Sequence, residues 1–389
     1  MMKIDEQKIK EVLERGVQEA IVKEELEKQL ISGQKIRLYF GIDPTGANLH
    51  LGHAVVLRKL KEFCDLNHEV ILLIGDFTAK IGDPSGRDTM RVSLSDKQIK
   101  ENFKDYKKQA SKILNFSKVK IKYNSQWLSK LRFADILKLS SHITVQQMLH
   151  RQMFDKRIKE DSPISVSEFM YPLMQGYDSV AMNVDLEIAG NDQLFNMLVG
   201  RDLQKIYNKK NKNVLTLKLL PGTDGRKMSK TYNNAIYLTD SPNEMYGKVM
   251  SIKDELIADY LGLCTSLNLE EIKKTANPRD QKAMLAKEIV KMYHGEKKAG
   301  EAEEEFSMTF RDNKPTFVEF TVDEAQIFYP ELISRITAVS TSEAKRLIIA
   351  GAVDINGMVD KEWKKNIDID KKGVEIKVGK KSFIKVKLG

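Results

Sequence analysis

Residues 36–53 read IRLYFGIDPTGANLHLGH, an apolar segment of strand length that runs into a glycine- and proline-marked loop and ends in two histidines. We predict a helix over about 52–65 and a second apolar strand, EVILLIG, at 69–75. A strand, a loop, a helix and a strand in this order are typical of a parallel sheet with crossover helices. This stretch therefore predicts an α/β fold with a Rossmann-like parallel sheet.

The rest of the sequence predicts a chain of several domains. Further strands are expected near 182–188 and 214–220, and the segment from 242 to about 310 has a helical pattern. The Asn356-Gly357 pair after a short apolar run is a strong β-hairpin signal. The predicted parts are an N-terminal helix at 1–33, the Rossmann-like sheet domain at 34–231, an α-helical domain at 232–315, a linker at 316–327 and a small α+β module at 328–389.

The charge of the chain is concentrated near its C-terminal end. The 389 residues carry a net charge of +9, and the last 29 residues hold ten lysines against four acidic residues. Such a surface is either a solvated lysine face or a footprint for the phosphates of a nucleic acid. The first thirty residues are too acidic for a transit peptide, and no apolar run approaches the ~20 residues that span a membrane. We expect a cytoplasmic protein without a membrane partner.

Two short segments carry the residues best suited to chemistry. The histidine motif, His50-Leu51-Gly52-His53, stands at a predicted helix N-terminus, where free N–H groups and imidazoles can donate hydrogen bonds to a phosphoryl oxygen. The lysine loop, GRKMSKT at 225–231, has three cations in five residues and can neutralise a polyphosphate. Taken singly, the first could be a metal site or a helix cap, and the second an ordinary solvated loop.

Together the two segments resemble the signature sequences of class I aminoacyl-tRNA synthetases. Three further segments, in order along the chain, make the sequence similar to the bacterial-type tyrosyl-tRNA synthetase family: IGDPSG at 81–86, YPLMQGYD at 171–178 and GNDQ at 190–193. The resemblance implies a ligase that activates L-tyrosine with ATP and transfers it to tRNA(Tyr), acting as a homodimer. It also implies that a connective insertion at about 115–165 holds the dimer interface.

The resemblance implies a role for individual residues of the amino-acid pocket. Tyr39 and Asp178 match the positions that hold the phenolic hydroxyl of tyrosine, where phenylalanine would leave polar groups unpaired, and tyrosyl enzymes are a known example of such rejection. Asp83, Tyr171 and Gln175 match the positions that hold the substrate ammonium group.

The resemblance also implies an ATP site. The matching positions are Asp43, Thr45, His50, Gly52, His53, Gly190, Asp192, Gln193, Lys227, Met228 and Lys230, with Arg87 and Arg91 near the pyrophosphate. Among these, catalytic roles fall to Thr45, His50, His53, Arg87, Arg91, Lys227 and Lys230. Mg²⁺ is expected with ATP, and no protein metal ligands are predicted. The chain departs from the commonest family pattern at Glu187, often Gln, and at Phe40, often a smaller residue.

The C-terminal segment resembles a small RNA-binding module shared with a ribosomal protein and with pseudouridine synthases. The resemblance rests on SEAKRLI at 342–348 and GAVDING at 351–357, and it places Lys345 and Arg346 towards RNA phosphates. Two alternatives stay open: a tryptophan–tRNA ligase of the same subclass, and a non-catalytic RNA-binding protein on a synthetase body. The pairing of Tyr39 with Asp178 and the C-terminal module speak against the first, and the presence of both motifs speaks against the second.

Overall fold

The chain folds into two units, Met1–Ala299 and Gly300–Gly389, which are considered separately. The computed structural model describes residues 5–46, 48–85, 94–229, 232–274, 277–310, 317–379 and 382–389. In this part of the chain, no helix has the length and apolar character needed to cross a membrane.

The N-terminal segment is two helices and a strand, so the prediction of one helix over 1–33 is wrong. Helix α1 (Glu6–Glu14) and helix α2 (Lys23–Ile31) flank β1 (Val17–Ile21), which pairs antiparallel with β6 (Asn213–Leu217). Gly16, at φ +69°, takes the left-handed conformation that ends the first helix. The apolar residues 17 and 21 fit helical spacing, but pairing with β6 decides their structure.

The sheet of the first unit has the order β1-β6-β5-β2-β3-β4, and every neighbouring pair except β1–β6 is parallel. Its other strands are β2 (Arg37–Ile42), β3 (Glu69–Ile74), β4 (Lys120–Tyr123) and β5 (Leu186–Gly190). The four strands predicted in this sheet are confirmed. Strand β4 was not predicted and lies inside the supposed insertion of 115–165, whose first part therefore belongs to the sheet.

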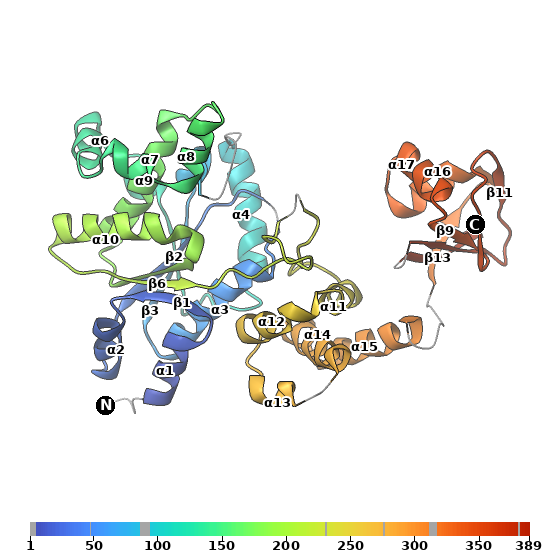
Figure 1. Cartoon of the computed structure of the whole chain (residues 1–389), viewed down its shortest axis with the longest axis horizontal. Coiled ribbons are helices and arrows are strands. Elements are labelled where there is room, and N and C mark those ends of the chain that lie inside the picture. The colour runs from blue at the N-terminus through green and yellow to red at the C-terminus, as the bar shows by residue number, and fades with distance from the viewer. Residues whose placement is uncertain are drawn as a thin grey trace. The chain divides into compact units, whose positions relative to one another are not determined.

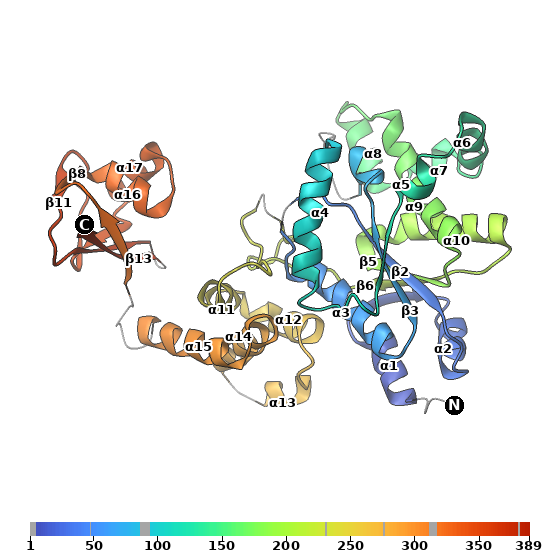
Figure 2. The same ribbon diagram turned by 180° about the vertical axis from the view of Figure 1, so that it is seen from behind.

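Helices cover both faces of this sheet. Helix α3 (Leu51–Asp65) connects β2 to β3, whereas α10 (Leu194–Asn208) connects β5 to β6 in the opposite direction along the sheet. Right-handed crossovers then place α3 and α10 on opposite faces, as both views show (Figures 1 and 2). The neighbours β2 and β5 are thus the point where the strand order reverses, and ligands bind outside the carboxyl ends of such strands.

Further helices of the first unit surround this framework. Helix α9 (Val166–Met182) packs along α10, and α4 (Asp96–Ala110) precedes β4. The segment after β4 consists of short helices: α5 (Ser125–Leu128), α6 (Phe133–Ser140), α7 (Val145–Leu149) and α8 (Gln152–Lys159). Single 3-10 turns, Thr78–Lys80 and Asn191–Gln193, follow β3 and β5.

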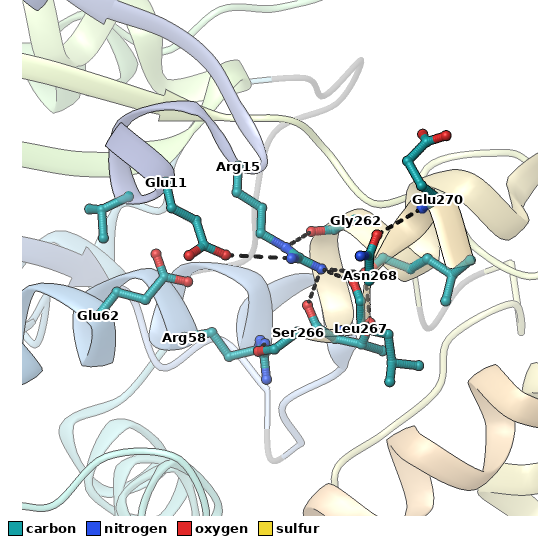
Figure 3. Close-up of polar contacts among 12 residues, drawn as sticks. Glu11, Arg15, Arg58, Glu62, Gly262, Ser266, Leu267, Asn268 and Glu270 are labelled. Atoms are coloured by element: carbon teal, nitrogen blue, oxygen red, sulfur yellow. Dashed lines mark hydrogen bonds and ion pairs between the residues drawn. The ribbon is translucent and has the colours of Figure 1, made fainter. Parts of the chain in front are cut away.

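The helical segment after the lysine loop is fixed to the sheet domain through the N-terminal segment. It comprises α11 (Pro242–Met250), a 3-10 turn (Asp254–Leu256), α12 (Ile257–Cys264), α13 (Leu269–Lys273) and α14 (Pro278–His294). Helix α15 (Glu296–Phe310) follows and includes the boundary between the two units. Arg15 donates to the carbonyl oxygens of Gly262, Thr265 and Leu267 at 2.9–3.3 Å, at the carboxyl end of α12 (Figure 3). Arg58 of α3 donates to Ser266 at 3.0 Å. A cation at a helix C-terminus satisfies carbonyls that would otherwise lack donors.

The second unit holds a five-stranded sheet of order β10-β9-β12-β13-β7 and a two-stranded sheet of β11 and β8. Its elements are β7 (Val318–Val322), β8 (Gln326–Phe328), α16 (Tyr329–Thr337), α17 (Thr341–Ile349), β9 (Val353–Ile355), β10 (Met358–Val359), β11 (Asn366–Asp368), β12 (Val374–Val378) and β13 (Ser382–Leu388). The hairpin is confirmed: Asn356 and Gly357, at φ +49° and +84°, join β9 to β10. The prediction of a linker over 316–327 is wrong, because β7 pairs in parallel with β13 and Val322 is buried in the module core.

Candidate active site

A cavity of about 1290 Å³ lies at the carboxyl ends of β2 and β5. It brings together every predicted site residue of the first unit that the structure describes. These are Tyr39, Asp43, Thr45, His50, Gly52, His53, Asp83, Tyr171, Gln175, Asp178, Gly190, Asp192, Gln193, Lys227 and Met228. Arg87, Arg91 and Lys230 lie outside the described residues.

One end of the cavity is a buried polar pocket around Tyr39 and Asp178. Asp178 of α9 is 3% exposed and accepts hydrogen bonds from Trp127 Nε1 at 2.7 Å and Asn124 Nδ2 at 3.3 Å. Burial raises the pKa of Asp178 well above its ordinary value, and these two donors act in the opposite direction. Tyr39 is fully buried, and burial together with the carboxylates of Glu187 and Asp178 raises its pKa. Tyr39 therefore stays protonated and can donate a hydrogen bond.

Next to this pocket, three side chains offer oxygen acceptors. Oxygen acceptors are the groups that bind a cation such as an ammonium group. Tyr171 donates its hydroxyl proton to Asp43 Oδ2 at 2.9 Å, so its oxygen can accept from another group. Asp83 Oδ2 accepts from Gln193 Nε2 at 2.6 Å, and its Oδ1 accepts from the Ser85 N–H at 2.9 Å. Gln175 Nε2 donates to Glu187 Oε1, so the amide oxygen of Gln175 points to the opposite side.

The histidine motif begins α3 on another wall. The backbone N–H of His50 donates to His53 Nδ1 at 3.2 Å, and the ring centroids are 3.9 Å apart. Burial, aided by His53 and Lys227, lowers the pKa of His50 to about 2, and burial lowers that of His53 to about 4. Both rings are therefore neutral near pH 7. Since His53 Nδ1 is an acceptor, its proton is on Nε2, which is a donor for a phosphoryl or ribose oxygen.

The segment that follows the lysine loop is joined to the segment around the histidine motif by backbone hydrogen bonds. Leu51 N–H donates to Ile236 O and Leu238 N–H donates to Leu49 O, both at 2.9 Å, just after the loop. Asn234, three residues after the loop, is 2% exposed and accepts from the N–H of Ser229 in the loop at 2.8 Å. It also donates to Oδ1 of Asp224, just before the loop, at 2.7 Å. Two motifs that are far apart in sequence therefore form one wall.

Lys227 spans the mouth of the cavity to the loop after β5. Its Nζ lies 3.3 Å from Asp192 Oδ2, and the two side chains are 55% and 27% exposed. An exposed pair of this kind is weak, so a phosphate and a ribose hydroxyl can take the two partners separately. Gly190 lies beneath this pair, and a Cβ there would be 2.8 Å from Asp192 Oδ1.

Several residues that hold the site together carry no motif and were not predicted. They are Asn124, Trp127, Ser179, Asn196, Lys212 and Asn234. Their roles depend on contacts between segments distant in sequence. Residues 208–213, NKKNKN, have the composition typical of an exposed turn, although Lys212 is fully buried.

The two predicted RNA-contacting residues lie on α17 of the second unit. Arg346 is exposed and pairs with Glu343 at 3.1 Å. Lys345 stacks over the Trp363 ring, with its Nζ 3.6 Å from the ring centroid. Both cations are at the surface of the module, at a helix that also presents the exposed Ile349.

A cavity at a sheet switch point, with neutral imidazoles at a helix N-terminus and a cationic loop opposite, places the chain among α/β enzymes that bind nucleotides. Residues 32–311 match the family described as tRNA synthetases class I (W and Y), and the chain belongs to that family.

Relatives that match the chain over nearly its full length are ligases for one amino acid. The chain is 46% identical to the tyrosine–tRNA ligase of Carboxydothermus hydrogenoformans, over 99% of each chain, and 45% identical to that of Thermotoga maritima, over 97% of each. A C-terminally truncated mitochondrial tyrosyl-tRNA synthetase of Aspergillus nidulans shares the fold, with a TM-score of 0.66 at 23% identity, over 78% of this chain and 94% of that one. The resemblance seen in the sequence is confirmed, and tryptophan is not favoured.

Proposed function

We infer that this chain is an ATP-dependent ligase that joins tyrosine to tRNA. The observation that carries the inference is the buried Tyr39–Asp178 pocket, which shares one cavity with the histidine motif and the lysine loop. A tyrosine side chain in this pocket places its hydroxyl between the Tyr39 hydroxyl and the carboxyl group of Asp178. Its ammonium group then reaches the oxygens of Asp83, Tyr171 and Gln175.

The reaction has two steps, and neither requires a protein nucleophile. The tyrosine carboxylate attacks the α-phosphorus of ATP, which releases pyrophosphate and leaves tyrosyl-adenylate. A ribose hydroxyl of the terminal adenosine of tRNA then attacks the acyl carbon and releases AMP. Catalysis rests on positioning and on stabilising the charge that develops on the phosphates.

Each wall of the cavity has a part in the first step. The neutral rings of His50 and His53 donate hydrogen bonds to ATP oxygens, while Gly52 lets the adenosine approach the backbone. Asp192 accepts from ribose hydroxyls with Gly190 beneath it, and Gln193 reaches the α-phosphate. Lys227 and Lys230 neutralise the leaving pyrophosphate, and we propose the same for Arg87 and Arg91. Asp43, Thr45 and Met228 shape the phosphate end.

Mg²⁺ is expected to enter with ATP, whose phosphates supply oxygen ligands. The described residues contain no group of three or more His, Cys, Asp or Glu side chains that could hold a metal ion.

The test of the reaction is ATP–pyrophosphate exchange with each of the twenty amino acids. Exchange with tyrosine alone is expected. Exchange with tryptophan and not tyrosine would overturn the amino-acid assignment, and absence of exchange with all twenty would favour a non-catalytic RNA-binding protein.

We propose that the second unit binds tRNA through α17 and the C-terminal lysines. Replacing Lys345 and Arg346 together by Ala should weaken tRNA(Tyr) binding about tenfold and lower the salt dependence of binding by about two ion contacts. The measurement is filter binding at several salt concentrations. ATP–pyrophosphate exchange, which does not involve tRNA, should be unchanged. An unchanged salt slope would remove these two residues from the RNA surface.

We also propose a homodimer formed through the insertion. Four large apolar side chains are exposed there, Phe133 75%, Leu137 56%, Val145 60% and Ile158 51%, and Val166, directly after it, is 77% exposed. Exposed apolar side chains gathered in one segment mark an interaction surface. Changing Phe133 and Leu137, one turn apart on α6, to Ser should shift the chain towards monomer in analytical ultracentrifugation.

The control for the dimer is Met358→Ser, at an equally exposed position (74%) in the second unit, which should leave the oligomeric state unchanged. An unaltered dimer in the double variant would place the interface elsewhere. A cytoplasmic location stays a prediction.

A further inference from the structure

A lysine and a glutamate form an ion pair beneath the amino-acid pocket. Lys212, just before β6, is fully buried, and Glu187, in β5, is 2% exposed. Space for the lysine is made by Gly200 of α10, where a Cβ would lie 2.6 Å from Lys212 Nζ and 2.9 Å from Ser179 Oγ. Burial lowers the pKa of Lys212, whereas Glu187 raises it. The missing Cβ at Gly200 thus leaves the space that the Lys212 side chain occupies.

The pair contacts the phenol end of the pocket through Ser179. Lys212 Nζ donates to Ser179 Oγ at 2.9 Å, and Ser179 Oγ lies 2.9 Å from the Tyr39 hydroxyl. Because an ammonium group can only donate, it occupies a lone pair of Ser179 and limits how the serine hydroxyl turns towards Tyr39. Lys212 thus holds Ser179 Oγ beside the Tyr39 hydroxyl, and either hydroxyl can be the donor between them.

The same pair contacts the ammonium end through Gln175. Glu187 Oε1 accepts from Gln175 Nε2 at 3.1 Å, and Gln175 Oε1 accepts from Asn196 Nδ2 at 2.9 Å. A carboxylate can only accept, so it fixes which way the Gln175 amide faces. Asn196 Nδ2 also donates to Gln193 Oε1 at 3.1 Å, and Gln193 Nε2 donates to Asp83 Oδ2 at 2.6 Å.

We propose that Lys212 and Glu187 are a positioning pair for tyrosine, holding Ser179 under the phenol pocket and Gln175 at the ammonium site. The proposal rests on the function inferred above and extends it to residues that do not carry the motifs. A buried ion pair contributes little net stability compared with apolar residues of the same volume. The ordering of Ser179 and Gln175 at the two ends of the pocket therefore explains the presence of this ion pair better than its effect on stability does.

The test compares Lys212→Met, Glu187→Gln and the double variant in ATP–pyrophosphate exchange, with thermal unfolding of each. Either single change leaves a buried charge without its partner. It should raise the KM for tyrosine about 10- to 100-fold, the factor expected for a hydrogen bond to a charged group, with the KM for ATP unchanged. The double variant removes both charges, so its thermal stability should recover relative to the single variants. It also lacks the Lys212 contact to Ser179, so its KM for tyrosine should stay raised.

The matched control is Lys210→Met, two residues away, whose Nζ pairs with Asp185 at 2.8 Å in a part-exposed position. It should leave both KM values unchanged. Equal rises in both KM values, or a double variant whose KM for tyrosine returns to the wild-type value, would overturn the proposal and leave the pair a purely structural role. If Lys212→Met does not fold, Glu187→Gln and the double variant decide in the same way. Lack of tyrosine-dependent exchange by the wild type would instead refute the inferred function.

Discussion

The two halves of the cavity are built in opposite ways. In the amino-acid half, Tyr39, Ser179 and Lys212 are fully buried and joined by hydrogen bonds of 2.9 Å. In the ATP half, Lys227 is 55% exposed and reaches Asp192 at 3.3 Å. Groups that select a substrate act best when they are fixed before it arrives, whereas cations that follow a departing pyrophosphate must move. On the function proposed above, selection of tyrosine and stabilisation of the leaving pyrophosphate belong to separate parts of one cavity.

The largest effect is expected from the buried half. Asp178→Ala removes the phenol acceptor and leaves the Trp127 donor unpaired, so tyrosine-dependent exchange should fall by about 10³-fold in kcat/KM. The control is Asp76→Ala, a nearby carboxylate that accepts from Ser125 Oγ at 2.6 Å and does not line the cavity. Wild-type exchange in Asp178→Ala would contradict the assignment of the phenol site.

A smaller effect, of another kind, is expected from the exposed half. Lys227→Ala should lower the rate of exchange by about 10²-fold, because a donor to the developing phosphate charge is lost. Tyrosine binding, measured by equilibrium dialysis without ATP, should not change. Lys253→Ala is the matched control, since its side chain is also 55% exposed and pairs weakly with Glu255 at 3.5 Å. Weakened tyrosine binding in Lys227→Ala would show that the two halves are not separate.

The same contrast explains what the sequence could and could not predict. Apolar runs identified β2 and β3, and the motifs identified the cavity residues, because both kinds of information are local. Strand β4, KIKY, was missed because two of its four residues are lysines, and β1 because pairing with β6 outweighs its helical spacing. Lys212 was missed because its burial depends on Gly200 and Glu187, which lie elsewhere in the chain. Local patterns thus predicted the groups expected to contact ATP and tyrosine, but not the residues that hold them in place.

The smallest effect should come from a change in salt concentration. This experiment compares the two halves of the cavity within one protein. Raising the salt from about 0.05 to about 0.5 M shortens the screening length from over 10 Å to below 5 Å, and it acts mainly on exposed charges. The KM for ATP should therefore rise about threefold and the KM for tyrosine less than about twofold. In Lys227→Ala the salt dependence of the KM for ATP should become shallower, since one exposed cation has been removed. Equal salt slopes for the two substrates would mean that tyrosine is also held by screened charges, and the buried network around Asp178 and Glu187 would then not be what fixes it.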